Sequence, residues 1–131
     1  MTQVRNNLQK AFGMWASHVN LTFTQVLNSS IADILIFFAS KNHSDSSNFD
    51  GPYGVLAHAY YPQNGDVHYD NDETWNIGGV GGIDFFSVSL HEIGHSLGLQ
   101  HSSVNGAVMY PTYQVWSNLT TDDINGIKAL Y

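Results

Sequence analysis

One short segment of the sequence holds three histidines and a glutamate at a spacing suited to a metal ion. His91 and His95 are four residues apart, so they share one face of a helix and can bind the same ion. Glu92 follows the first histidine directly, so its carboxylate can reach a water molecule on that ion. Gly98 suits the left-handed residue that ends many helices, and the turn brings in His101 as a third ligand.

Three protein ligands leave one position of a tetrahedral zinc ion open, which is the arrangement of a catalytic rather than a structural zinc. Zinc lowers the pKa of a bound water towards about 7, and an adjacent carboxylate can take its proton. The shorter pattern H-E-x-x-H arises by chance in apolar helices, but the glycine and the third histidine make the full run specific. The alternative is a helix with three buried, hydrogen-bonded histidines, which leaves the acid beside them unexplained.

A second group of potential ligands lies upstream, and its spacing is less informative. Its members are His43, Asp45, His58 and His68, a nitrogen and oxygen set that suits tetrahedral zinc. Taken alone, this spacing favours ordinary surface histidines. An acidic stretch at 66–73 offers the oxygen ligands that calcium selects, and a solvated acidic loop is the alternative there.

Composition bounds the rest of the molecule. The chain has 131 residues, no cysteine and a formal net charge of −7, with only four Lys plus Arg. Its length predicts one domain that needs no disulfide. Its acidity leads us to expect neither nucleic acid nor an anionic membrane as a partner. The apolar run at 34–39 is far shorter than a membrane span and predicts a buried strand.

Hydrophobic spacing predicts the elements that position these side chains, and together they indicate an α+β domain. A loop rich in Ser, Asn, Asp and Gly is expected at 41–54. The last helix is predicted to begin at Thr120 and to turn Ile124, Ile127 and Leu130 inward. The other expected elements are a helix over 2–18, strands near 21–26, 32–39, 55–60 and 66–70, and a helix over 84–98.

Residues beyond the third histidine connect the sequence to a known family. Met109, in the run A-V-M-Y-P, supplies the downstream methionine of the metzincin signature. Ser102 directly after His101 resembles the matrixins, the matrix metalloproteinase family, and the resemblance extends from the first helix to Tyr131. It implies a single zincin-like domain over 1–131, with a twisted mixed β-sheet and three α-helices. In that fold the methionine forms a hydrophobic floor beneath the three imidazoles.

The resemblance also assigns the upstream ligands to a structural zinc. The segments around His43, His58 and His68 resemble the matrixin patterns H-x-D, L-A-H-A-F and D-x-H-F-D. With Asp45, they would close a four-ligand site. Two zinc ions, one catalytic and one structural, are therefore expected.

At least one calcium ion is implied as well. The residues that match the main matrixin calcium site are Asp50, Gly51, Tyr53, Val55, Asp70 and Glu73. A further calcium site is implied at Asp33 and Asp66, although the stretch between His58 and His68 is shorter than in the vertebrate family pattern.

The implied activity is that of a zinc endopeptidase in which Glu92 is the general base. A matrixin binds an extended polypeptide as an added strand beside residues 55–60, with the Ala57 carbonyl facing the scissile amide. The segment Pro111 to Tyr113 walls the pocket for the P1′ side chain, which follows the scissile bond. Ser87 stands where many matrixins have a bulkier residue, so we expect an open pocket for Leu, Met or a larger apolar residue.

The sequence also departs from the family pattern. It begins at Met1, already within the first helix, so the strand that precedes this helix in matrixins is expected to be missing. A propeptide with its inhibitory cysteine and a hemopexin-like domain are absent from it as well. A catalytically silent zinc- and calcium-binding module is therefore the alternative function, although the intact Glu92 argues against it. An astacin-like or reprolysin-like protease is a third hypothesis, against which Ser102 and the second ligand set argue.

We infer the localisation from the resemblance to the matrixin family rather than from a targeting segment, since the sequence has no signal peptide. Sequons of the form N-x-S/T begin at Asn20, Asn28, Asn42 and Asn118. Composition alone predicts about two. We therefore expect a secreted, monomeric protein that acts on protein or peptide substrates.

Overall fold

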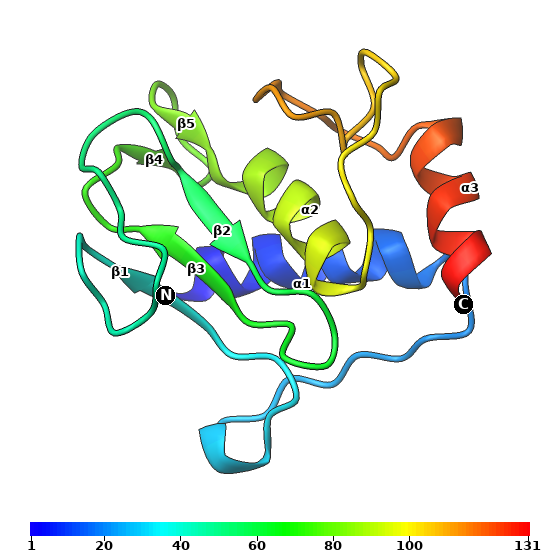
Figure 1. Cartoon of the computed structure of the whole chain (residues 1–131), viewed down its shortest axis with the longest axis horizontal. Coiled ribbons are helices and arrows are strands. Elements are labelled where there is room, and N and C mark those ends of the chain that lie inside the picture. The colour runs from blue at the N-terminus through cyan, green and yellow to red at the C-terminus, as the bar shows by residue number, and fades with distance from the viewer.

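The computed structural model describes residues 1–131 and combines α-helices with two small β-sheets, which confirms the expected α+β class (Figure 1). Three α-helices are present, as predicted. They are α1 (Thr2–Ala16), α2 (Phe85–Ser96) and α3 (Thr121–Leu130), and a short 3-10 helix, η1, spans Ser29–Ile31. The strands are β1 (Ile36–Ala39), β2 (Ala57–Ala59), β3 (Val67–Asp70), β4 (Trp75–Asn76) and β5 (Ile83–Asp84).

The larger sheet is mixed and has the strand order β1-β3-β2. β3 runs parallel to β1 and antiparallel to β2, and all of its residues are buried. The antiparallel register places His58 directly opposite His68. β2 forms one edge of the sheet, so one side of its backbone is free to pair with another chain.

α2 lies at the centre of the molecule, with the strands on one side, α3 on the other and α1 behind it (Figure 1). Every residue of α2 is buried, and half of them are polar, including His91, Glu92 and His95. Trp15 of α1 fixes the helix pair, because its indole Nε1–H donates to the Leu90 carbonyl at 3.0 Å. A second apolar cluster, which includes Val67, Phe85 and Val88, joins α2 to the sheet.

Local signals set the ends of the helices that carry the site. Asp84 caps α2 by accepting a hydrogen bond from the Ser87 N–H at 2.7 Å. Gly98 has φ +110°, the left-handed region that ends a helix at little cost to glycine. Thr120 and Asp123 form a capping box at the start of α3. None of the helices combines the length and apolar character that a membrane crossing requires.

The strand predicted at 21–26 is not formed. This segment makes no backbone hydrogen bond to another strand. Leu21 and Phe23 instead pack against the helical core, where Phe23 contacts Phe12 with ring centroids 4.7 Å apart, while Val26 is exposed. Alternating apolar residues can be buried without a strand partner, and the pattern cannot distinguish the two cases.

Several boundaries also differ from the sequence-based prediction. β1 and β2 are shorter than expected, and the parallel pair β4–β5, two residues per strand, was not predicted. Strands this short carry no periodicity to recognise. Leu130 is 50% exposed rather than turned inward, whereas Ile127 is fully buried.

Candidate active site and metal centres

His91 and His95 face each other on α2 in the way that ligands of one metal ion do. Their Nε2 atoms are 3.1 Å apart. The Nδ1–H of His91 donates to the Val108 carbonyl at 2.6 Å, and that of His95 to the Leu99 carbonyl at 2.7 Å. Each neutral imidazole therefore presents a lone pair at Nε2. Two lone pairs this close repel one another unless a cation lies between them, so the pair fits zinc.

His101 reaches the same point from beyond the helix. Its ring centroid is 4.7 Å from that of His95 and 5.3 Å from that of His91. The potential ligand atoms of the three histidines lie within 4.8 Å of one another. The turn at Gly98 makes this approach possible. Directly after it, the Leu99 N–H donates a hydrogen bond to the Gly94 carbonyl in the last turn of α2. The structure thus brings together the three residues that the sequence singled out.

Burial sets the protonation states of this group. It lowers the pKa of His91 to about 4 and also lowers the pKa of His95, so both remain neutral and able to bind metal at pH 7. Glu92 is 8% exposed, and its carboxylate accepts no hydrogen bond within the protein. Burial raises the pKa of Glu92 to about 8. A cation at the adjacent histidines would counter this effect by favouring the ionised form.

Met109 and Asp123 do not face the metal site, but they contact the segments that carry its ligands. Met109 is 3% exposed and packs against Gly94, the residue before His95. The Asp123 carboxylate accepts hydrogen bonds from the backbone N–H groups of Val108 (2.9 Å) and Met109 (3.0 Å). Since the Val108 carbonyl also accepts from a metal-facing histidine, Asp123 positions that ligand indirectly. The capping pattern revealed Asp123 as part of a helix start, but not this distant contact.

The four upstream ligands also converge. Asp45 Oδ2 lies 2.9 Å from His43 Nε2, 3.0 Å from His58 Nε2 and 2.9 Å from His68 Nδ1. Nitrogen and oxygen ligands at about 2.0–2.1 Å from a tetrahedral zinc lie about 3.3 Å from one another. The His43 Nδ1–H donates to the Lys41 carbonyl at 2.9 Å, which leaves its Nε2 lone pair facing the other ligands. Four protein ligands would close this site, so it fits a structural zinc.

Hydrogen bonds keep the carboxylate of this group ionised. Burial alone would raise the pKa of Asp45, but hydrogen bonds from the Ser47 N–H, the Tyr60 hydroxyl and His58 outweigh it and hold the pKa well below its usual range. Burial lowers the pKa of His68. An anionic oxygen beside neutral imidazoles is the ligand state that zinc requires.

The predicted calcium residues gather where the 41–54 loop meets the end of β3. Asp50 Oδ1 accepts from the Val55 N–H at 3.1 Å, and Gly51 and Tyr53 both have positive φ. Asp70 Oδ2 and Glu73 Oε1 are buried and have no hydrogen-bond partner. Burial raises the pKa of Glu73, and the charges of the neighbouring carboxylates, among them Asp70 and Asp50, raise it further.

Unpartnered buried carboxylate oxygens fit a hard cation such as calcium. Unlike the two histidine groups, Asp50, Asp70 and Glu73 do not form a set of three whose ligand atoms all lie within 4.8 Å of one another. Of the second predicted calcium pair, Asp66 Oδ1 accepts from the Leu35 N–H at 2.8 Å, while Asp33 is exposed.

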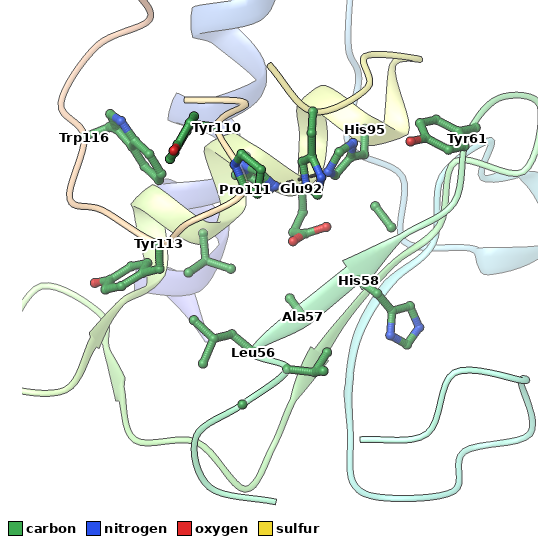
Figure 2. Close-up of a pocket in the computed structure, with 16 residues that line it drawn as sticks. Leu56, Ala57, His58, Tyr61, Glu92, His95, Tyr110, Pro111, Tyr113 and Trp116 are labelled. Atoms are coloured by element: carbon green, nitrogen blue, oxygen red, sulfur yellow. Dashed lines mark hydrogen bonds between the residues drawn. The ribbon is translucent and has the colours of Figure 1, made fainter. Parts of the chain in front are cut away.

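A cleft of about 490 Å³ runs between α2 and β2. The three histidines of the catalytic group and Glu92 line it. Figure 2 shows the Glu92 carboxylate directed into it, with Ala57 on the opposite wall. Pro111 and Tyr113 line one end and Tyr61 lies at the other.

Ser87 does not line the cleft, contrary to the prediction, because it is fully buried. Trp116 occupies the cleft wall instead and hydrogen-bonds to Ser87. No local sequence pattern indicates this contact, since the two residues are 29 positions apart.

Comparison with known proteins places this arrangement in a family. The family model described as Matrixin matches residues 1–131. The hatching enzyme of Paracentrotus lividus is 47% identical over 131 residues, which cover 98% of this chain and 22% of that protein. Matrix metalloproteinase-2 of Drosophila melanogaster is 49% identical over 140 residues, covering 99% of this chain and 18% of that protein.

Matrilysin of Mus musculus is 49% identical over 131 residues, covering 95% of this chain and 49% of that protein. The chain therefore spans less than half the length of each of these relatives. A family match along the whole sequence, at these identities, shows that the chain belongs to the matrixins, a family of zinc metalloendopeptidases.

Proposed function

We propose that this domain is a zinc endopeptidase that hydrolyses extended polypeptides, with Glu92 as its general base. The observation that carries the proposal is the pair of Nε2 atoms of His91 and His95, 3.1 Å apart, beside a carboxylate in an open cleft. Family membership supports the same enzyme class. A silent metal-binding module remains the alternative, but it gives no role to a buried acid without a partner.

The side chains divide the chemistry among themselves. Zinc held by the three histidines would supply a Lewis acid that polarises the scissile carbonyl and lowers the pKa of a water molecule. Glu92 takes a proton from the attacking water at a carboxylate oxygen and then delivers it to the nitrogen of the leaving amine. The Val108 and Leu99 carbonyls hold His91 and His95 in the tautomer that binds metal.

The backbone of β2 is the proposed binding edge for substrate. Leu56 and Tyr60 form hydrogen bonds towards β3. Because bonding direction alternates along an antiparallel strand, the N–H and carbonyl of Ala57 point to the open edge beside the cleft. An extended peptide can pair there as an added strand. Its P1′ side chain would enter the apolar end of the cleft lined by Val88 and Pro111.

Further metals are proposed from the two other groups. His43, Asp45, His58 and His68 hold a structural zinc. Asp70 and Glu73 bind calcium, with further oxygens from the loop that contains Asp50. We also infer secretion, since all four sequon asparagines are exposed, and we expect a monomer.

The test is cleavage of a quenched fluorescent peptide with an apolar P1′ residue, with zinc and calcium present. Glu92→Gln keeps the shape of the side chain but removes the base, so we expect turnover to fall by about 10²–10⁴-fold while zinc stays bound. A zinc chelator should abolish turnover as well. Asp122→Asn, a carboxylate outside the cleft, is the matched control and should retain activity. Turnover that survives Glu92→Gln would exclude the proposed base.

Zinc content separates the alternatives. Two zinc ions per chain by mass spectrometry under native conditions would support both sites. A folded, zinc-loaded protein that cleaves no peptide would favour the silent module.

A further inference from the structure

Trp116 closes the end of the cleft where Pro111 and Tyr113 form the wall. It is 8% exposed and lines the cleft together with Val88 (Figure 2). Its ring lies nearly parallel to the His91 imidazole, at 17° with centroids 6.4 Å apart. An apolar side chain that passes His91 therefore meets the indole.

Hydrogen bonds from three directions fix this tryptophan. Its backbone N–H donates to Ser87 Oγ at 2.8 Å, and the Ser87 hydroxyl donates to its carbonyl at 3.3 Å. Its indole Nε1–H donates to the Gly106 carbonyl at 3.1 Å. A single buried hydroxyl thus ties the segment to α2 by both its N–H and its carbonyl.

A second anchor holds the same wall. The Asp84 N–H, at the N-terminus of α2, donates to the Tyr113 hydroxyl at 2.9 Å. The wall segment 111–116 is therefore fastened to the first turn of α2 at two points. Ser87, one helical turn before His91, is small enough to leave space beside the helix, but the tryptophan segment occupies that space.

We propose that Trp116, held by Ser87, is a specificity-determining residue that limits the length of the P1′ side chain. The inference rests on the proposed endopeptidase function and replaces the open pocket that Ser87 alone suggested. Aliphatic side chains of the length of Leu or Met fit in front of the indole. A longer group, such as biphenylalanine, must displace the indole and break its hydrogen bonds.

The experiment compares kcat/KM for two peptides that differ only at P1′, one with Leu and one with biphenylalanine. Trp116→Leu keeps an apolar core residue but removes the ring, so the ratio of long to short substrate should rise at least about tenfold. Ser87→Ala removes both backbone anchors and should raise the ratio in the same direction by a smaller factor. Val115→Ala, in the same segment but 72% exposed, is the matched control and should leave the ratio unchanged.

The ratio distinguishes the outcomes. An unchanged ratio in an active Trp116→Leu enzyme would overturn the specificity role while leaving the proposed function intact. If Trp116→Leu does not fold, Ser87→Ala carries the test by the same ratio. A folded, zinc-loaded wild type that cleaves neither peptide would overturn the proposed function itself, and with it this inference.

Discussion

Two carbonyl groups decide how the histidines of α2 can act. The carbonyls of Val108 and Leu99 accept the Nδ1 protons, and the Nε2 lone pairs are left for metal. These hydrogen bonds by themselves favour the imidazolium, but burial outweighs them and disfavours the charged form that would compete with zinc. As a result, His91 and His95 are neutral and already oriented for metal at physiological pH.

Acid release of zinc follows from these pKa shifts. A lowered pKa means that protons compete with zinc only at lower pH, and burial lowers the pKa of His91 to about 4. We therefore expect the zinc of this site to persist as pH falls through 6.5, the ordinary histidine value, and to leave as pH approaches 4. A zinc indicator read across a pH series measures the release. A midpoint at the ordinary histidine value would contradict the prediction.

Asp123 is the residue on which the support of the site depends. Its carboxylate accepts from Val108, Met109 and Thr120, so Asp123→Asn points an amide N–H₂ at backbone donors. Leaving a buried donor unpaired costs roughly 1–3 kcal/mol of unfolding free energy, and lost outer-shell support weakens zinc binding by about 10–100-fold.

Urea unfolding and a zinc competition assay measure the two effects of Asp123→Asn. Asp122→Asn, the neighbouring and less buried acid, should change both much less. Equal effects of the two substitutions would show that the Asp123 network has no special role.

Among the contacts between secondary-structure elements, the close approach of α2 to the segment around Met109 requires a glycine. A Cβ at Gly94 would clash with Met109 Sδ and lie 3.0 Å from the Trp15 ring. Gly94→Ala should therefore destabilise the domain by roughly 1–3 kcal/mol and loosen the zinc site, because the turn must move away.

Gly13 in α1 offers the matched control for Gly94→Ala. A Cβ there has no neighbour within 4 Å. Gly13→Ala should stabilise the domain by about 0.5–1 kcal/mol, since alanine loses less backbone freedom in a helix. Thermal unfolding of both variants checks the opposite signs. Stabilisation by Gly94→Ala would show that the turn has room to spare.

At the scale of the whole molecule, bound cations would compensate charge that the fold buries. The chain carries a formal net charge of −7, and buried oxygens of Asp70 and Glu73 have no partner. Calcium at 100 times its Kd should stabilise the folded protein by about 2.7 kcal/mol. The double variant Asp70→Asn/Glu73→Gln should lose this response. Thermal unfolding with and without calcium, at constant zinc, measures it.

Asp33, an exposed residue of the second predicted calcium site, provides the control for the calcium experiment. Asp33→Asn should leave the response unchanged if Asp70 and Glu73 form the stabilising site. A wild-type melting temperature that does not respond to calcium would contradict the assignment.

Short-range sequence patterns were enough to predict the catalytic ligand set, the α+β class and the three helices. The spacing of His91, His95 and Gly98 already implied a shared helix face and a turn, because both depend on residues within a few positions of one another. The α+β class and all three helices followed from periodicity and capping for the same reason.

Contacts between distant segments could not be predicted from the sequence. The carbonyl that orients His91 is 17 residues away, and Ser87 meets Trp116 across 29. Segment 21–26 alternates like a strand yet pairs with none. Such outcomes depend on which surfaces meet when the elements pack, and neither periodicity nor capping carries that information. Local sequence patterns therefore indicated the groups that we propose to do the chemistry, whereas packing decides what holds them and what lines the cleft.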